Sequence, residues 1–144
     1  MFLGKFQHSI DGKGRLTIPS RYREMIGGQN LVVCKGFSGN LVVFTEESFM
    51  EYAQSLKTLR STNPKEARIR RYITTSASEA RLDPQGRILI TQELRDAAGL
   101  KKDAVVTGNI DSFEIWSPER WAEVDDFEEA DDLAGDIEEL GIHL

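Results

Sequence analysis

Polar and apolar residues alternate in a short segment of this chain, residues 15–18, where Arg15 and Thr17 are interleaved with Leu16 and Ile18. A two-residue period of this kind predicts a β-strand with one buried face. Residues 87–90 repeat the segment as Arg-Ile-Leu-Ile and predict a second such strand. Further short strands are expected near residues 5–10, 31–36, 41–44, 77–82, 104–108 and 113–116.

Helix signals lie between these segments. Helices of about two turns are expected near residues 20–26 and 92–98, each followed by a glycine where a left-handed cap belongs. The sequences Thr45-Glu46-Glu47 and Ser117-Pro118-Glu119 supply a capping hydroxyl and first-turn acids, so each predicts the start of a helix. The first of these helices is expected to run to about residue 60. A further helix is expected at about 64–75, and the last twenty residues are left undecided.

The chain is an internal duplication with a shift of 72 positions. Residues 11–49 align without a gap on residues 83–121, and nine of these positions are identical. The shared features include an Asp-x-x-Gly-Arg turn, which contains Asp11 and Gly14 in one copy and Asp83 and Gly86 in the other. Features common to both copies are expected to be architectural, whereas features of one copy alone indicate function.

The predicted architecture is α+β and rich in strands. One repeat has too few strands to bury both faces of a sheet, so the two repeats are expected to interlock as a small β-barrel with peripheral helices. The expected division is a first repeat at 5–47, an inserted helical hairpin at 48–75, a second repeat at 76–119 and an acidic tail at 120–144.

Composition sets limits on the function. The 144 residues are 40% hydrophobic with a net charge of −6, which is enough apolar material for a core. Residues 1–75 hold 12 Lys/Arg against 6 Asp/Glu, whereas residues 76–144 hold 6 against 18. The last 23 residues carry ten acids without a lysine or arginine, which indicates a tail that either screens the basic residues from non-specific partners or aids solubility.

No apolar run is long enough for a transmembrane helix, and the N-terminal residues do not resemble a signal peptide. The single cysteine, Cys34, is expected to be a buried small hydrophobic residue. A cytoplasmic protein without a membrane partner is therefore expected.

Catalytic signals are weak. The two histidines, His8 and His143, have no metal-ligand spacing, and neither a phosphate-binding glycine loop nor a nucleophile elbow is present. Asp11 and Asp83 each open a turn and are expected to cap backbone N–H groups there. The sequence thus predicts a protein that is not an enzyme and needs no metal or cofactor.

The two copies of the turn differ in charge. Residues 11–24 carry Lys13, Arg15, Arg21 and Arg23 against two acids, a net charge of +2, whereas the equivalent residues 83–96 have a net charge of −1. Basic side chains at a turn and a helix start can neutralise phosphates and reach guanine edges. The four basic residues are therefore candidate DNA contacts, with Arg87 a weaker one. Arg15 and Arg87 also have a purely structural interpretation, in which each pairs with the aspartate of its own turn.

The helical insert is the candidate surface for self-association. Its first helix carries an apolar stripe and its second helix is basic. The candidate interface residues are Phe49, Tyr52, Leu56, Arg68 and Arg71. A second DNA surface on the basic helix remains an alternative.

The segment from Asp11 to Glu24, Asp-Gly-Lys-Gly-Arg-Leu-Thr-Ile-Pro-Ser-Arg-Tyr-Arg-Glu, closely resembles the signature of the MraZ family of bacterial transcription factors, which contain two SpoVT-AbrB repeats. Asp83 to Leu100 resembles the second repeat of that family. The resemblance spans about residues 1–121 and leaves out the acidic tail.

The resemblance implies a swapped-hairpin barrel and a ring-shaped homo-oligomer. It also implies binding to direct repeats in the promoter of the division and cell-wall gene cluster, with repression the usual outcome. Carried over by position, the DNA contacts fall on Lys13 and Arg15, with Arg21 and Arg23 nearby. The alternative function is a scaffold or antitoxin-like interaction module that binds no DNA.

Overall fold

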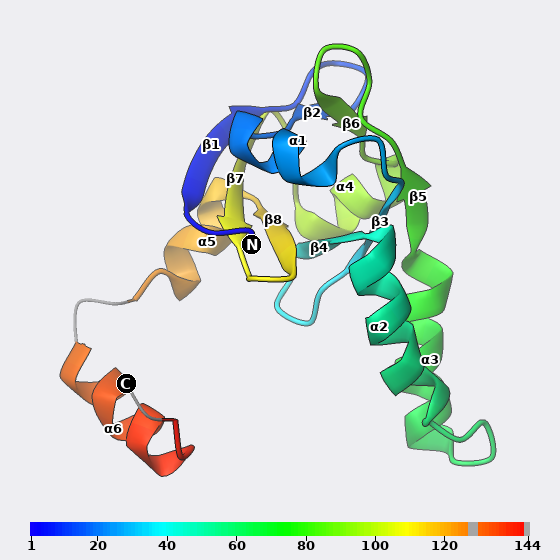
Figure 1. Ribbon diagram of the computed structural model, residues 1–144, viewed down its shortest axis with the longest axis vertical. Helices are drawn as coiled ribbons and strands as arrows, with labels where there is room; N and C mark the ends of the chain where they lie inside the picture. Colours follow the sequence, from blue (N-terminus) through cyan, green and yellow to red (C-terminus); the bar gives the residue numbers. More distant parts are fainter. Residues whose placement is uncertain (127–129, 143–144) are drawn as a thin grey trace.

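The computed structural model describes residues 1–126 and 130–142 (Figure 1). The strands of the first repeat are β1 (Lys5–Ser9), β2 (Arg15–Thr17), β3 (Leu31–Lys35) and β4 (Leu41–Thr45), and those of the second are β5 (Ser78–Ala80), β6 (Arg87–Leu89), β7 (Asp103–Gly108) and β8 (Ser112–Trp116). The helices are α1 (Ser20–Ile26), α2 (Glu46–Lys57), α3 (Pro64–Ser76), α4 (Gln92–Ala98), α5 (Pro118–Val124) and α6 (Ala130–Glu139). Both two-turn helices begin and end at the residues expected from the sequence.

Strands of the two repeats are interleaved in one antiparallel sheet of order β1-β7-β8-β4-β3-β5. The first strand of each repeat pairs with the third strand of the other, β1 with β7 and β5 with β3, and β4 pairs with β8 at the centre. The second strands, β2 and β6, form a separate antiparallel ribbon. Each repeat therefore completes the sheet of the other, as the duplication predicts.

The α+β, strand-rich class is confirmed, but hydrogen bonds between the described strands do not close a barrel. The six-stranded sheet has free edges at β1 and β5, and the β2–β6 ribbon stands apart from it. Each ribbon strand is only three residues long. Backbone bonds instead fasten the ribbon to the turns of the opposite repeat: the Ile18 N–H donates to Gly86 O at 2.9 Å, and the Ile90 N–H donates to Gly14 O at 2.9 Å.

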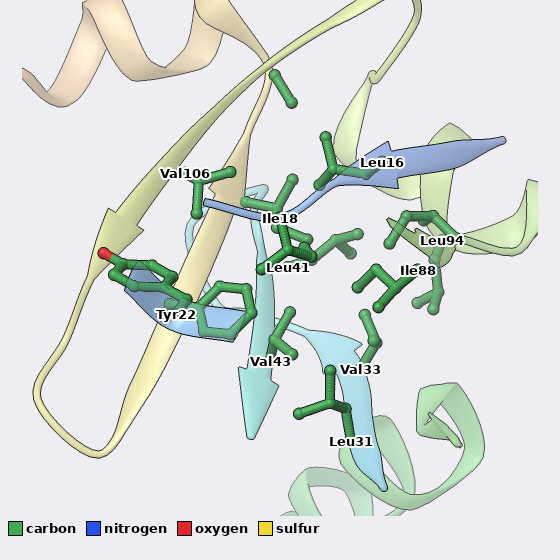
Figure 2. Close-up of a cluster of buried hydrophobic side chains, with 14 of the residues drawn as sticks. Leu16, Ile18, Tyr22, Leu31, Val33, Leu41, Val43, Ile88, Leu94 and Val106 are labelled. Atoms are coloured by element: carbon green, nitrogen blue, oxygen red, sulfur yellow. The ribbon is translucent and has the colours of Figure 1, made fainter. Parts of the chain in front are cut away.

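The main core lies between the ribbon and the sheet (Figure 2). Leu16 and Ile18 are fully buried, as are their repeat equivalents Ile88 and Ile90, and Val33, Leu41, Val43 and Val106 face them from the sheet. The alternation predicted for residues 15–18 is confirmed, because Arg15 and Thr17 on the other side of β2 stay partly exposed. Burial of this apolar surface is the main stabilising contribution to the fold.

A second, smaller core joins the α2–α3 pair to the sheet. Leu56 and Ile73 are buried with Cys34, and Phe44 of β4 stacks on Tyr52 of α2 at a ring-centroid distance of 4.9 Å. Thr45 and Asn63 cap the two helices, because their side-chain oxygens accept from Ser48 N and from Lys65 N and Glu66 N. The burial of Cys34 is confirmed, and it raises the pKa of this thiol to about 11.

The C-terminal region contains two helices. The short α5 follows β8, and α6 stands apart from the sheet in Figure 1, on the side opposite the α2–α3 pair. Among the described residues, no helix is long and apolar enough to cross a bilayer.

Candidate nucleic-acid interface

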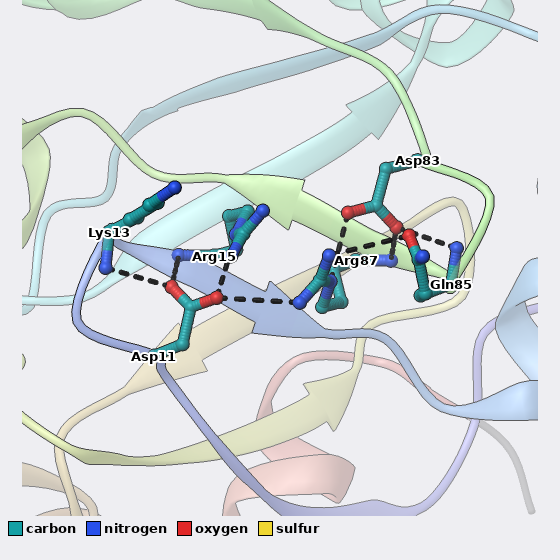
Figure 3. Close-up of polar contacts among 6 residues, drawn as sticks. All are labelled: Asp11, Lys13, Arg15, Asp83, Gln85 and Arg87. Carbon is teal, nitrogen blue, oxygen red and sulfur yellow. Dashed lines mark hydrogen bonds and ion pairs between the residues drawn. The ribbon is translucent and has the colours of Figure 1, made fainter.

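The β2–β6 ribbon brings the two Asp-x-x-Gly-Arg turns together on one face (Figure 3). Arg15 lies opposite Leu89, and Thr17 lies opposite Arg87. Because successive residues of a strand face opposite sides, Arg15, Thr17, Arg87 and Leu89 share the outer face, and Leu16 and Ile88 fill the core beneath them. Residues separated by 72 positions are thus neighbours in space.

Within each turn the aspartate is the acceptor that organises the loop. The Asp11 Oδ1 accepts from the backbone N–H groups of Lys13 at 3.0 Å and Arg15 at 2.9 Å, and its Oδ2 accepts from Arg15 Nε at 2.7 Å. Asp83 makes the same contacts with Gln85 and Arg87, each at 2.9 Å.

These bonds favour the charged form of both carboxylates. The backbone N–H of Arg15 and then its guanidinium hold the pKa of Asp11 at about 2. For Asp83, burial acts in the opposite direction, but the backbone N–H and guanidinium of Arg87 outweigh it, so the pKa also lies below its usual value.

The two arginines differ in what else they contact. Arg87 uses both terminal nitrogens: Nη1 donates to Asp11 Oδ2 across the ribbon at 3.4 Å, and Nη2 donates to Gln85 Oε1 at 3.3 Å. In the part of the chain that the structure describes, Arg15 is paired only through Nε. Figure 3 shows this difference. Arg15 therefore keeps its two terminal nitrogens for a ligand, whereas Arg87 is committed to the two turns.

The neighbouring cations strengthen this asymmetry. The Lys13 and Arg21 side chains are exposed, and 34% of the Arg15 side chain is accessible. The corresponding residues of the second repeat are Gln85, Arg87 and Glu93, so the same geometry there carries less positive charge. The first turn therefore has more exposed positive charge around its arginine than the second turn has.

Arg23, a fourth candidate contact, lies in a different environment. It packs beneath the turn of the second repeat so closely that a Cβ on Gly86 would clash with its guanidinium, and its Nε is buried without a partner in the described structure. It also lowers the pKa of His8, after the larger effect of burial. Arg23 therefore contacts the other repeat rather than the outer face.

Arg95 is the residue that sequence reasoning missed. It is the repeat equivalent of Arg23, and it packs beneath the first turn, where a Cβ on Gly14 would lie 2.7 Å from its Cζ. Gly14 also has a φ of +87°, so both its conformation and this close approach require glycine. The identity of Arg23 and Arg95 in an otherwise divergent pair of helices was the available signal, since shared residues are expected to be architectural.

The candidate interface residues divide into two groups. Leu56 is buried, and Phe49 and Tyr52 pack on Phe44 within the chain, so most of the apolar stripe of α2 is used internally. Arg68 and Arg71 on α3 are exposed. Exposed apolar residues lie beside them, namely Ile69, Tyr72 and Phe37.

Comparison with known proteins gives a consistent result. A family model described as "MraZ protein, putative antitoxin-like" matches residues 1–72 and again residues 73–135. The chain is 41% identical over 143 residues to the "Transcriptional regulator MraZ" of Lachnoclostridium phytofermentans, with 99% of each protein covered. It is 42% identical over 144 residues to the protein of that name from Corynebacterium jeikeium, with 100% of each covered.

Among solved structures, the chain is similar to "The solution structure of PHS018 from pyrococcus horikoshii", with 18% identity and a TM-score of 0.33 over 80% of this chain and 88% of that one. A score this low carries no argument about the fold.

Proposed function

The chain belongs to the MraZ family of transcriptional regulators, and we propose that it acts by binding promoter DNA through the turn of its first repeat. The observation that carries the proposal is the pairing of Arg15. Its Nε is fixed by Asp11, and this orients a planar fork whose outer nitrogens have no partner among the described residues, on a side chain that is 34% exposed. A fork of this kind matches the O6 and N7 acceptors of guanine in the major groove.

The neighbouring residues take complementary parts. Lys13 and Arg21 are exposed beside the fork and would neutralise phosphates, which sets register and affinity. Arg23 supports the second turn from beneath, Arg87 joins the two turns on the outer face, and a contact from Arg87 to DNA is the weaker possibility. Asp11, Gly14, Asp83 and Gly86 hold the backbone of the turns in place.

The target that we propose is double-stranded DNA with short direct repeats, in the promoter of a division and cell-wall gene cluster, and the proposed effect is repression. Identical subunits on successive repeats would gain affinity through multivalency. This function implies a protein of the cytoplasm that is associated with the nucleoid.

The architecture proposed for this function is a swapped hairpin of the AbrB type, in which each repeat completes the sheet of the other. It consists of a SpoVT-AbrB repeat at 5–47, the helical insert at 48–75, a second repeat at 76–119 and the acidic tail at 120–144. Copies of the chain assemble into a ring-shaped homo-oligomer. Arg68 and Arg71 of α3 supply the exposed part of the interface, and Phe49, Tyr52 and Leu56 support the helix pair from inside.

The test is a binding titration of the full chain against its own upstream DNA and against a shuffled sequence of equal length. We expect preference for the upstream DNA and a steep loss of affinity with rising salt, because each neutralised phosphate releases counterions. Equal and weak retention of both DNAs, with a flat salt dependence, would favour the scaffold or antitoxin-like module instead.

Light scattering at micromolar concentration tests the proposed oligomer, and a monomer would contradict it.

A further inference from the structure

Helix α6 has an apolar stripe whose two outer residues are exposed and whose central residue, Ile137, is half-buried. Leu133 and Leu140 are 40% and 75% exposed, and with Ile137 they follow the i, i+4, i+7 spacing of one helix face. Leu140 still belongs to this helical turn, because its N–H donates to Asp136 O at 3.0 Å. An apolar stripe on a helix that stands apart from the sheet indicates a docking surface.

The charge of α6 narrows the choice of partner. Its ten residues include five acids without a lysine or arginine. Asp136 lies beside the stripe, at the i+3 position relative to Leu133. The occupant opposite α6 must therefore offer apolar surface flanked by positive charge.

Helix α3 presents such a surface. Lys65, Arg68, Ile69 and Tyr72 follow the i, i+3, i+4, i+7 spacing of one face, and Ile69 and Tyr72 are 44% and 38% exposed. Phe37, which is 69% exposed, extends this patch by stacking on Tyr72 at a centroid distance of 5.2 Å. The helix contains four basic residues against one acid.

Three of the four positions of the α3 face have a counterpart in α6, with the charge reversed at one of them, whereas Lys65 corresponds to the apolar Leu133. Ile69 in α3 corresponds to Ile137 in α6, Tyr72 to Leu140, and Arg68 to Asp136. We propose that α6 of one copy of this chain docks on the Lys65–Tyr72 face of α3 in a second copy. Its apolar stripe covers Ile69 and Tyr72, and its acids lie against the arginines.

The partner is a second copy because the two helices lie on opposite sides of one molecule. Figure 1 shows α6 beyond α5 on one side of the sheet and the α2–α3 pair on the other. DNA would match the charge of α3, but it would leave Ile69 and Tyr72 without apolar cover. An acidic helix with an apolar stripe satisfies both requirements.

This inference rests on the proposed self-association and assigns a pair of surfaces to it. One helix pair buries little area, so a single contact is weak. Repetition of the contact between identical subunits would give it strength through effective concentration.

Cross-linking between two populations of the full chain tests the contact. One population carries Ile69→Cys and the other carries Ile137→Cys with a different tag. The native Cys34 stays in place, because it is buried and its pKa is raised. We expect a mixed disulfide dimer on mild oxidation. The matched control is Thr74→Cys, which is exposed on a different face of α3 and should cross-link at least tenfold less.

Charge reversal sharpens the test. Arg68→Asp should lower the yield of the Ile69–Ile137 cross-link about tenfold, and Asp136→Arg in the other population should restore it, because like charges in contact are unfavourable. Equal yields from residues 69 and 74, no cross-link, or closure within one chain that carries both cysteines would each overturn the proposal. Titration of the unmodified protein with its upstream DNA reports on the proposed function separately.

Discussion

The two Asp-x-x-Gly-Arg turns have nearly the same backbone and different chemistry. In each, an aspartate accepts two backbone N–H groups and the Nε of an arginine. In the second turn, Gln85 and Asp11 engage the two remaining nitrogens of Arg87. In the first turn, Lys13 stands where Gln85 would be and leaves Arg15 accessible. The two turns thus share one architecture and differ in the partners of their arginines, and the proposed division into a binding turn and a supporting turn rests on this difference.

The largest expected effect is a loss of stability on truncating side chains of the core that the two repeats share. Leu16→Ala and Ile88→Ala remove equivalent, fully buried side chains from the ribbon, and each should lower the free energy of unfolding by about 2–5 kcal/mol. Urea denaturation of the two variants measures this. A decrease in the free energy of unfolding in only one of the two variants would show that the two repeats do not contribute equally to the core.

Substitution of the two arginines on the outer face of the ribbon should weaken DNA binding to different extents. Arg15→Ala should weaken specific DNA binding by about 1–3 kcal/mol for each subunit in contact, and more in an oligomer, while the fold is retained. Arg87→Ala should weaken it less, because this guanidinium is already paired within the protein. Fluorescence anisotropy with upstream DNA compares the affinities of the two variants, and thermal unfolding checks that each is folded. Equal losses of DNA affinity in the two variants would contradict the proposed difference in role between the two turns.

A smaller effect on DNA affinity is expected from the two arginines that each pack under the turn of the other repeat. Arg95 belongs to the second repeat but packs under the first turn, whereas Arg23 packs under the second. Arg95→Ala should therefore reduce specific affinity about fivefold, or about 1 kcal/mol, by loosening the binding turn. Arg23→Ala should reduce it less, although Arg23 is closer in sequence to the binding residues. The reverse order would indicate that Arg23 contacts DNA directly.

The smallest effect concerns acid titration. The folded pKa of Asp11 is about 2, below its ordinary value, so its contribution to stability is complete above about pH 4. That contribution is lost as the pH falls through the folded pKa. Carboxyl chemical shifts in an NMR titration should place the midpoint of Asp11 near 2 and that of Asp83 below its ordinary value. In Arg15→Ala the midpoint of Asp11 should rise only in part, since the backbone N–H bond remains; an unchanged midpoint would show that the guanidinium contributes nothing.

Local features of the fold were predictable from the sequence because they depend on local chemistry. The alternation at residues 15–18 predicted the burial of Leu16 and Ile18, and the capping residue Thr45 predicted where α2 begins. The repeat also predicted that the two halves interlock.

Contacts across the pseudo-symmetry could not be predicted in this way. The bond from Arg87 to Asp11 and the packing of Arg95 on Gly14 depend on how the ribbon pairs, which spacing along one strand does not determine. The apolar stripe of α2 was identified correctly as apolar, but its internal partners Phe44, Cys34 and Ile73 come from other elements. Charge patterns likewise did not distinguish the packed Arg23 from the exposed Arg21.

The most direct test of the central claim exchanges the character of the two turns. The variant Lys13→Gln with Arg21→Glu gives the first turn the residues of the second, and Gln85→Lys with Glu93→Arg does the reverse. Lys101→Gln with Lys102→Glu matches the charge change of the first variant at residues outside the two turns. Titrated against upstream DNA at one salt concentration, the first variant should lose specific binding while the Lys101/Lys102 control keeps most of it, and the second should bind at least as tightly as the unmodified chain. Retention of specific binding by the first variant, or an equal loss in the charge-matched control, would contradict the assignment of DNA recognition to the first turn.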